Sequence, residues 1–148
     1  MIYIKLENEL DFSPQLLENA ARVTLELSAV RDADLTLVLT GNEQVRALNL
    51  EFLGIDGATD VLSFPAEETD PETGRAYLGD VVISLPQAAE QAESRGHGVE
   101  AEIQLLVVHG VLHLLGHDHA EETEKTRMWA LQAKALASLG VKAGIPEE

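Results

Sequence analysis

Four of the five histidines in the chain fall within eleven residues, HGVLHLLGHDH, at positions 109–119. His109 and His113 stand four residues apart, a spacing that places both imidazoles on one face of a helix, about one turn apart. Two imidazoles in that arrangement can bind one transition-metal ion. The stretch therefore predicts a metal site. Because the chain has no cysteine, every ligand has to be a histidine, aspartate or glutamate.

A third ligand has to approach this pair from another direction. On a straight helix His117 would lie about 12 Å along the axis from His109, whereas zinc–nitrogen bonds are only about 2.0–2.1 Å long. Gly116 can adopt the left-handed conformation that ends a helix and reverses the chain, which would bring His119 back over the pair. We therefore expect His109, His113 and His119 to hold one Zn²⁺ per chain, or another divalent transition metal, with the fourth position open to water.

The resulting pattern, H-x3-H-x2-G-x2-H, has the spacing of the metzincin zinc peptidases, with one change. In those enzymes the residue after the first histidine is the glutamate that acts as general base, whereas this chain has Gly110. Loss of a general base removes roughly a hundredfold to ten-thousandfold of rate. The motif thus favours a metal site without peptidase chemistry. The alternative interpretation is that the histidines are packed or capping residues of the core.

Several neighbouring residues have two interpretations. Asp118 could orient a metal ligand and His117 could face the substrate, but an ordinary turn at a helix C-terminus explains both equally well. His97 stands between two glycines and is interpreted as a loop residue without a chemical role. Met128 and Trp129 indicate core packing rather than a methionine turn beneath a metal.

The elements that must position these residues follow from hydrophobic periodicity. Alternating or short apolar runs predict strands at 2–6, 35–40, 61–65 and 77–85. Apolar residues at helical spacing, with Ser, Pro and Gly at the boundaries, predict helices at 13–27, from 41 to the turn-rich GIDGATD, from 86, at 99–115 and at 121–139. The polar stretch 66–74 is predicted to be an exposed loop. The helix at 99–115 is apolar on nearly every side, which predicts a central buried helix carrying the histidine pair.

These elements predict an α/β (α+β) fold, a small mixed sheet surrounded by helices, in a single domain covering residues 1–148. The N-terminus has no signal-peptide pattern and no apolar stretch approaches the roughly 20 residues of a membrane span, so the expected location is the cytoplasm. With 26 acidic and 10 basic residues, the formal net charge is −16. This charge argues against broad non-specific nucleic-acid binding, and we expect neither DNA nor a membrane as a partner.

The histidine stretch resembles the signature of the YbeY family of bacterial rRNA maturation factors, H-G-x-L-H-L-x-G-[YH]-D-H, throughout residues 109–119. Two more stretches, ATDVLSFP at 58–65 and LGDVVIS at 78–84, agree with the family in order and spacing. The resemblance implies a zinc-dependent endoribonuclease specific for single-stranded RNA, with His109, His113 and His119 as ligands. It also implies maturation of the 16S rRNA 3′ end, ribosome quality control, and the small ribosomal subunit and assembly proteins as partners.

One departure from the family concerns an arginine. Family members commonly carry it in an N-x-x-[FY]-R stretch, where it is thought to contact the RNA phosphate, and this chain has Leu53 at that position. Loss of a guanidinium beside a scissile phosphate removes a charge-assisted contact. Arg46 and Arg75 are candidates to replace it, although a scattered arginine is usually a solvated charge.

Two further residues are candidates for the site. Asp80 matches the family's aspartate and is interpreted either as a catalytic base that orients water or as a structural carboxylate that accepts backbone hydrogen bonds. Ser63 either lines a groove beside the metal or is an ordinary strand serine. Two alternative functions stay open at this point: a metal-dependent hydrolase of another bond, and a non-catalytic, metal-stabilised ribosome assembly factor, which Leu53 and the acidic charge favour.

Overall fold

Four strands and five helices make up the part of the chain that the computed structural model describes, residues 1–7, 9–117 and 121–141. In chain order they are β1 (Ile2–Leu6), α1 (Gln15–Leu27), β2 (Ala33–Thr40), α2 (Asn42–Leu53), β3 (Val61–Thr69), β4 (Ala76–Ser84), α3 (Leu85–Arg95), α4 (Val99–Leu114) and α5 (Glu122–Leu139). The mixed α/β class predicted from the sequence is confirmed.

The strands form one mixed sheet in the order β1-β2-β4-β3. β1, β2 and β4 run parallel, whereas β3 is antiparallel to β4 and lies at the edge. Leu37 pairs with both Ile4 and Val81, so these side chains point to the same face of the sheet. The neighbouring positions along each strand, such as Asp80, point to the opposite face.

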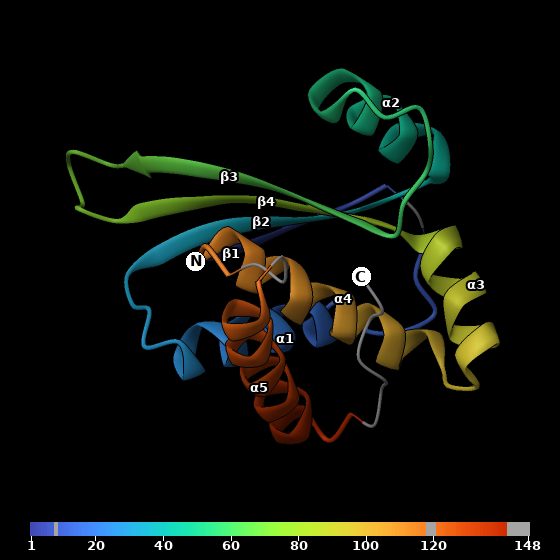
Figure 1. Cartoon of the computed structure of the whole chain (residues 1–148). Helices are drawn as coiled ribbons and strands as arrows, with labels where there is room; N and C mark the ends of the chain where they lie inside the picture. Colours follow the sequence, from blue (N-terminus) through green and yellow to red (C-terminus); the bar gives the residue numbers. More distant parts are fainter. Residues whose placement is uncertain (8, 118–120, 142–148) are drawn as a thin grey trace.

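The two faces of the sheet are covered very differently. α1, α4 and α5 lie on one face, and α2 lies on the other (Figure 1). The main core fills the first face, where Leu35, Leu37, Val81 and Ile83 pack beneath α4. A smaller cluster on the second face contains the buried residues Val45, Leu62 and Val82. We call these the closed face and the open face of the sheet.

The predicted end of β3 at Pro65 is wrong, because the strand continues to Thr69. Residues 66–69 were expected in an exposed loop, and the turn between β3 and β4 spans only 70–75. Proline lacks an N–H group but is tolerated on an edge strand, which is where β3 lies. The pairing register shifts between Pro65 and Glu68. The polar composition of this segment thus reflects an exposed hairpin rather than a loop.

The central helix α4 is buried as predicted. All its residues from Glu102 to Leu112 are buried, as is Leu114. Gly110 lets the helix lie directly on the sheet, because a Cβ at this position would come within 2.5 Å of Val81 Cγ1. Ser63 Oγ on β3 donates a 2.9 Å hydrogen bond to the Gly110 carbonyl oxygen. No helix in the described residues is long and apolar enough to cross a membrane.

Candidate metal centre

The histidine pair lies at the C-terminal end of α4, on the closed face of the sheet. The Nε2 atoms of His109 and His113 are 3.2 Å apart, and the ring centroids are 4.7 Å apart. His109 is 2% exposed and His113 is half-buried. The predicted helical spacing therefore brings both imidazoles together, with the same nitrogen of each ring directed at the other.

The His109 ring is also contacted by α5. Its Nδ1 lies 3.0 Å from the amide oxygen Oε1 of Gln132, a fully buried residue. The Trp129 ring lies beside it, at a centroid distance of 5.9 Å and an interplanar angle of 34°. Met128 is fully buried in the core, which confirms its predicted packing role. One ring nitrogen of His109 is therefore bound to the protein and the other faces His113.

This geometry fits a shared metal ion. Two nitrogens bound at about 2.0–2.1 Å to one tetrahedral ion lie about 3.3–3.4 Å apart, close to the 3.2 Å observed. Without an ion, the same distance lets one ring donate a hydrogen bond to the other. Among the described residues, no group of three His, Asp or Glu side chains could hold a metal. The predicted third ligand, His119, lies outside the described residues, and so does Asp118.

Gly116 ends α4 in the left-handed conformation that the sequence predicts. Gly116 has φ +94°, in the range that favours glycine. The Gly116 N–H donates to the His113 carbonyl at 3.0 Å, and the His117 N–H donates to the Leu112 carbonyl at 3.0 Å. These two bonds form a Schellman motif. His117 thus takes part in the helix-ending turn through its backbone N–H group.

Ser63 lies on the same face of the sheet as the histidines. Its hydroxyl binds the carbonyl of Gly110, the residue that follows His109. The serine therefore joins the edge strand to the helix beside His109, the first candidate ligand. The residue after His109, where the peptidases have their glutamate base, is Gly110. Val81 occupies the space that the Cβ of a glutamate at this position would need.

The structure does not bring Asp80 to the histidine pair. Asp80 pairs with Phe64 in the antiparallel ladder and lines a groove of about 310 Å³ on the open face, together with Phe52 and Phe64. Its carboxylate accepts a hydrogen bond from the Tyr77 hydroxyl, and burial together with this carboxylate raises the pKa of Tyr77. The sequence could not show on which face of the sheet Asp80 lies. Its partner is a tyrosine hydroxyl and not the backbone N–H groups of the structural interpretation, and its role as a catalytic base stays a prediction.

Neither proposed substitute for the family arginine is available as a free cation. Leu53, at the end of α2 on the open face, is 57% exposed. Arg46 forms a 2.6 Å ion pair with Asp56. Arg75 binds Asp34 at 2.7 Å and Asp32 at 3.6 Å. These hydrogen bonds and ion pairs raise the pKa of both arginines.

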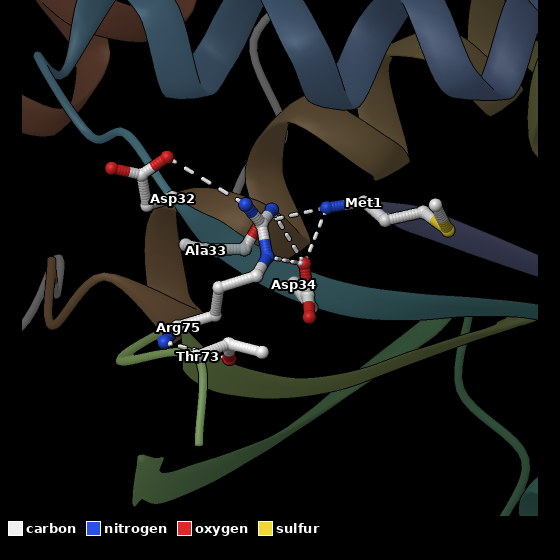
Figure 2. Close-up of polar contacts among 6 residues, drawn as sticks. All are labelled: Met1, Asp32, Ala33, Asp34, Thr73 and Arg75. Carbon is white, nitrogen blue, oxygen red and sulfur yellow. Dashed lines mark hydrogen bonds and ion pairs between the residues drawn. The ribbon is translucent and has the colours of Figure 1, made fainter. Parts of the chain in front are cut away.

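Figure 2 shows the surroundings of Arg75, which lies beside the N-terminal residue Met1. The N-terminal amine and the Arg75 guanidinium both contact the Asp34 carboxylate. The hydrogen bond from Arg75, followed by that from the amine, lowers the Asp34 pKa to about 2. This cluster is therefore a network of surface charges that neutralise one another.

Two buried polar residues escaped the sequence analysis. Gln132 is a polar residue within the apolar stripe of α5, and Glu102 is a charged residue on a helix predicted to be buried on nearly all sides. Glu102 is bound by Arg95 Nη1 at 3.0 Å and by His97 Nε2 at 2.6 Å. His97 lies in a loop as predicted, and its ring contacts this buried carboxylate. A polar residue at a core position was the available signal in both cases.

Comparison with known proteins gives a consistent result. The family model described as Endoribonuclease YbeY matches residues 4–140. A Heliobacterium modesticaldum protein named Endoribonuclease YbeY is 44% identical over 123 residues, which cover 76% of this chain and 74% of that protein. A Mycobacterium protein of the same name is 41% identical over 143 residues, covering 91% and 81%. The solution structure of a Thermotoga maritima protein has a TM-score of 0.63 at 28% identity and covers 100% of this chain and 99% of that one.

Proposed function

Because the chain belongs to the YbeY endoribonuclease family, we propose that it is a zinc-dependent endoribonuclease that cleaves single-stranded RNA. The facing Nε2 atoms of His109 and His113, 3.2 Å apart on a buried helix, carry the metal part of this proposal. His119 is the proposed third ligand. When bound, a zinc ion supplies Lewis acidity towards water and towards a phosphoryl oxygen.

The residues of the chain contribute position and selectivity. His109 and His113 hold the ion at the end of α4, and the Ser63 hydroxyl fixes the helix against β3 beside it. Gly110 places no carboxylate next to the metal, and the contact with Val81 leaves no room for one. This contact counts against hydrolysis of peptide bonds by the metzincin route. A phosphodiester is the bond that the family assignment favours.

The substrate and partners follow from the family resemblance. We propose small-subunit rRNA near its 3′ end as the substrate, the small ribosomal subunit and assembly proteins as partners, and ribosome quality control in the cytoplasm as the setting. The net charge of −16 supports local contacts with RNA rather than binding along a broad basic surface. Leu53 removes one such contact relative to the family, so we expect slower cleavage than in family members that carry the arginine.

The test is cleavage of a single-stranded rRNA fragment by purified protein, with metal content measured on the same samples. Wild type should cut, and His113→Ala should lose at least a hundredfold in rate together with its metal, while keeping its circular dichroism spectrum. His97→Gln changes a histidine outside the site and is the matched control, expected to keep its metal and to cut within a few-fold of wild type. Cleavage by a metal-free variant would overturn the zinc-dependent mechanism.

A third variant, Leu53→Arg, restores the family's guanidinium. A faster reaction of this variant would show that the metal site is intact and that the phosphate contact limits the rate. If metal binds and none of the proteins cuts RNA, the non-catalytic assembly factor becomes the better assignment.

A further inference from the structure

Gln132 is the polar member of an otherwise apolar buried stripe on α5. The buried residues of this helix are Met128, Gln132, Ala135 and Leu136, which form one stripe facing the core. Gln132 is 0% exposed. Burial of a carboxamide costs free energy unless hydrogen bonds replace those that water would make. A leucine of similar size would fit the stripe without that cost.

The hydrogen bond of Gln132 determines which nitrogen of His109 carries the proton. A carbonyl oxygen can only accept, so the 3.0 Å contact between Gln132 Oε1 and His109 Nδ1 requires an N–H at Nδ1. A neutral imidazole has one N–H group, and its lone pair is then on Nε2. That is the nitrogen lying 3.2 Å from His113 Nε2. The contact from α5 thus leaves the lone pair on the side where α4 places the second imidazole.

The nitrogen of the Gln132 side-chain amide forms no hydrogen bond with the described residues. This Nε2 group is buried. A buried donor without a partner destabilises the folded protein. The residue therefore contributes little to stability as a whole, while its oxygen makes one contact that acts directly on His109. The neighbouring Trp129 ring restricts the same imidazole from the side.

We propose that Gln132 is a positioning residue of the metal site, which holds His109 in the Nδ1–H tautomer and in the ring orientation that directs Nε2 towards His113. This inference rests on the proposed function for the presence of a metal. Metal-bound histidines commonly donate their other N–H group to an oxygen of the protein, and loss of that partner typically weakens metal binding about 10- to 100-fold.

The test compares three variants at the same position with a control. Gln132→Leu removes the acceptor and keeps the volume, and Gln132→Glu keeps an oxygen acceptor in place. Gln104→Leu replaces a second buried glutamine, on α4, and controls for the general effect of losing a buried amide. Gln132→Ala is the fallback if the leucine does not fold. Thermal unfolding and circular dichroism establish that each variant is folded.

Two readouts without RNA follow. The Zn²⁺ dissociation constant, measured by competition with a chromophoric chelator, should rise about 10- to 100-fold in Gln132→Leu and stay within a few-fold of wild type in Gln132→Glu and Gln104→Leu. Nitrogen-15 NMR of the histidines in the metal-free protein should show the Nδ1–H tautomer of His109 in wild type. In Gln132→Leu the Nε2–H tautomer should become populated.

The outcomes separate this inference from the proposed function. A folded Gln132→Leu that binds Zn²⁺ as tightly as wild type, with an unchanged His109 tautomer, overturns the positioning role alone. A wild type that binds Zn²⁺ no better than His113→Ala overturns the metal site itself, and the positioning role falls with it. Loss of RNA cleavage with normal Zn²⁺ binding affects only the proposed enzymatic activity.

Discussion

The closed and open faces of the sheet carry polar groups in two different ways. On the closed face, the main core has 21 buried hydrophobic members among the described residues, and they surround a few polar side chains that include His109 and Gln132. On the open face, the corresponding described cluster has three members, and the polar residue Asp80 lines a groove there. Polar contacts within an apolar core are strong and costly to leave incomplete, whereas exposed ion pairs contribute little. The number of polar contacts is therefore a poor guide to their importance in this protein.

The largest expected effect comes from the buried charge of α4. Glu102 is 0% exposed and binds both Arg95 and His97. Glu102→Ala leaves Arg95 and His97 without their carboxylate partner and should lower the free energy of unfolding by about 3 kcal/mol, measured by denaturant titration. Glu100→Ala, at an exposed position of the same helix, should change it by less than about 1 kcal/mol. Equal effects of the two substitutions would remove the distinction between buried and exposed charge.

A second prediction concerns the contact between α4 and the sheet. A methyl group at Gly110 would meet Val81 Cγ1 at 2.5 Å, and valine side chains are stiff. Gly110→Ala should therefore cost about 1–3 kcal/mol of stability, despite the better helix propensity of alanine. Gly57→Ala is the control, because a Cβ there meets nothing within 4 Å. In a double-mutant cycle with Val81→Ala, the double variant should be more stable than the sum of the single effects predicts. Additive effects would show that the helix adjusts freely.

Asp80 provides a smaller effect on the open face. Asp80→Asn weakens the hydrogen bond from Tyr77 and should lower stability by about 1 kcal/mol. Its Zn²⁺ dissociation constant should stay within about twofold of wild type, because its side chain points away from α4. Loss of metal binding in this variant, measured by the same chelator competition, would place Asp80 in the site and contradict the assignment of the two faces.

The smallest effect is expected from the surface cluster of Figure 2. The Asp34 pKa is lowered from 3.8 to about 2, mainly by its hydrogen bond with Arg75. A lowered pKa means that this carboxylate stabilises the folded state above its usual pKa, and that the contribution is lost as the pH falls through about 2. NMR titration should find the Asp34 pKa nearer its usual value in Arg75→Gln, with little change of stability at pH 7. A large loss of stability at pH 7 would show that exposed ion pairs matter more than we expect.

The sequence predicted the elements well because their signals are local. The period of α4, its end at Gly116 and the spacing of His109 and His113 all depend on residues within a few positions of one another. The strand ending at Pro65 was misplaced because a proline normally excludes a central strand. Its tolerance at this point depends on β3 being an edge strand, which is a property of the whole sheet.

The parts of the site that the sequence missed depend on contacts between distant elements. Gln132 contacts His109 only because α5 packs beside α4. The α5 sequence alone does not indicate which of its polar residues is buried against that histidine. Asp80 and Val81 are neighbours in a shared motif, yet strand alternation sends them to opposite faces. The motif therefore indicated a family, whereas the structure was needed to show on which face of the sheet each residue lies.

The parallel pairing of β1, β2 and β4 also affects the order of events in folding. The sheet forms only after distant segments pair, for example Ile2 with Leu35 and Leu37 with Val81. His109, His113 and Gln132, by contrast, come from two consecutive helices. Pairings between distant segments are slow to form because closing a long loop costs entropy. Assembly of the sheet should therefore limit the refolding rate, so added Zn²⁺ should slow unfolding and leave the rate of refolding nearly unchanged.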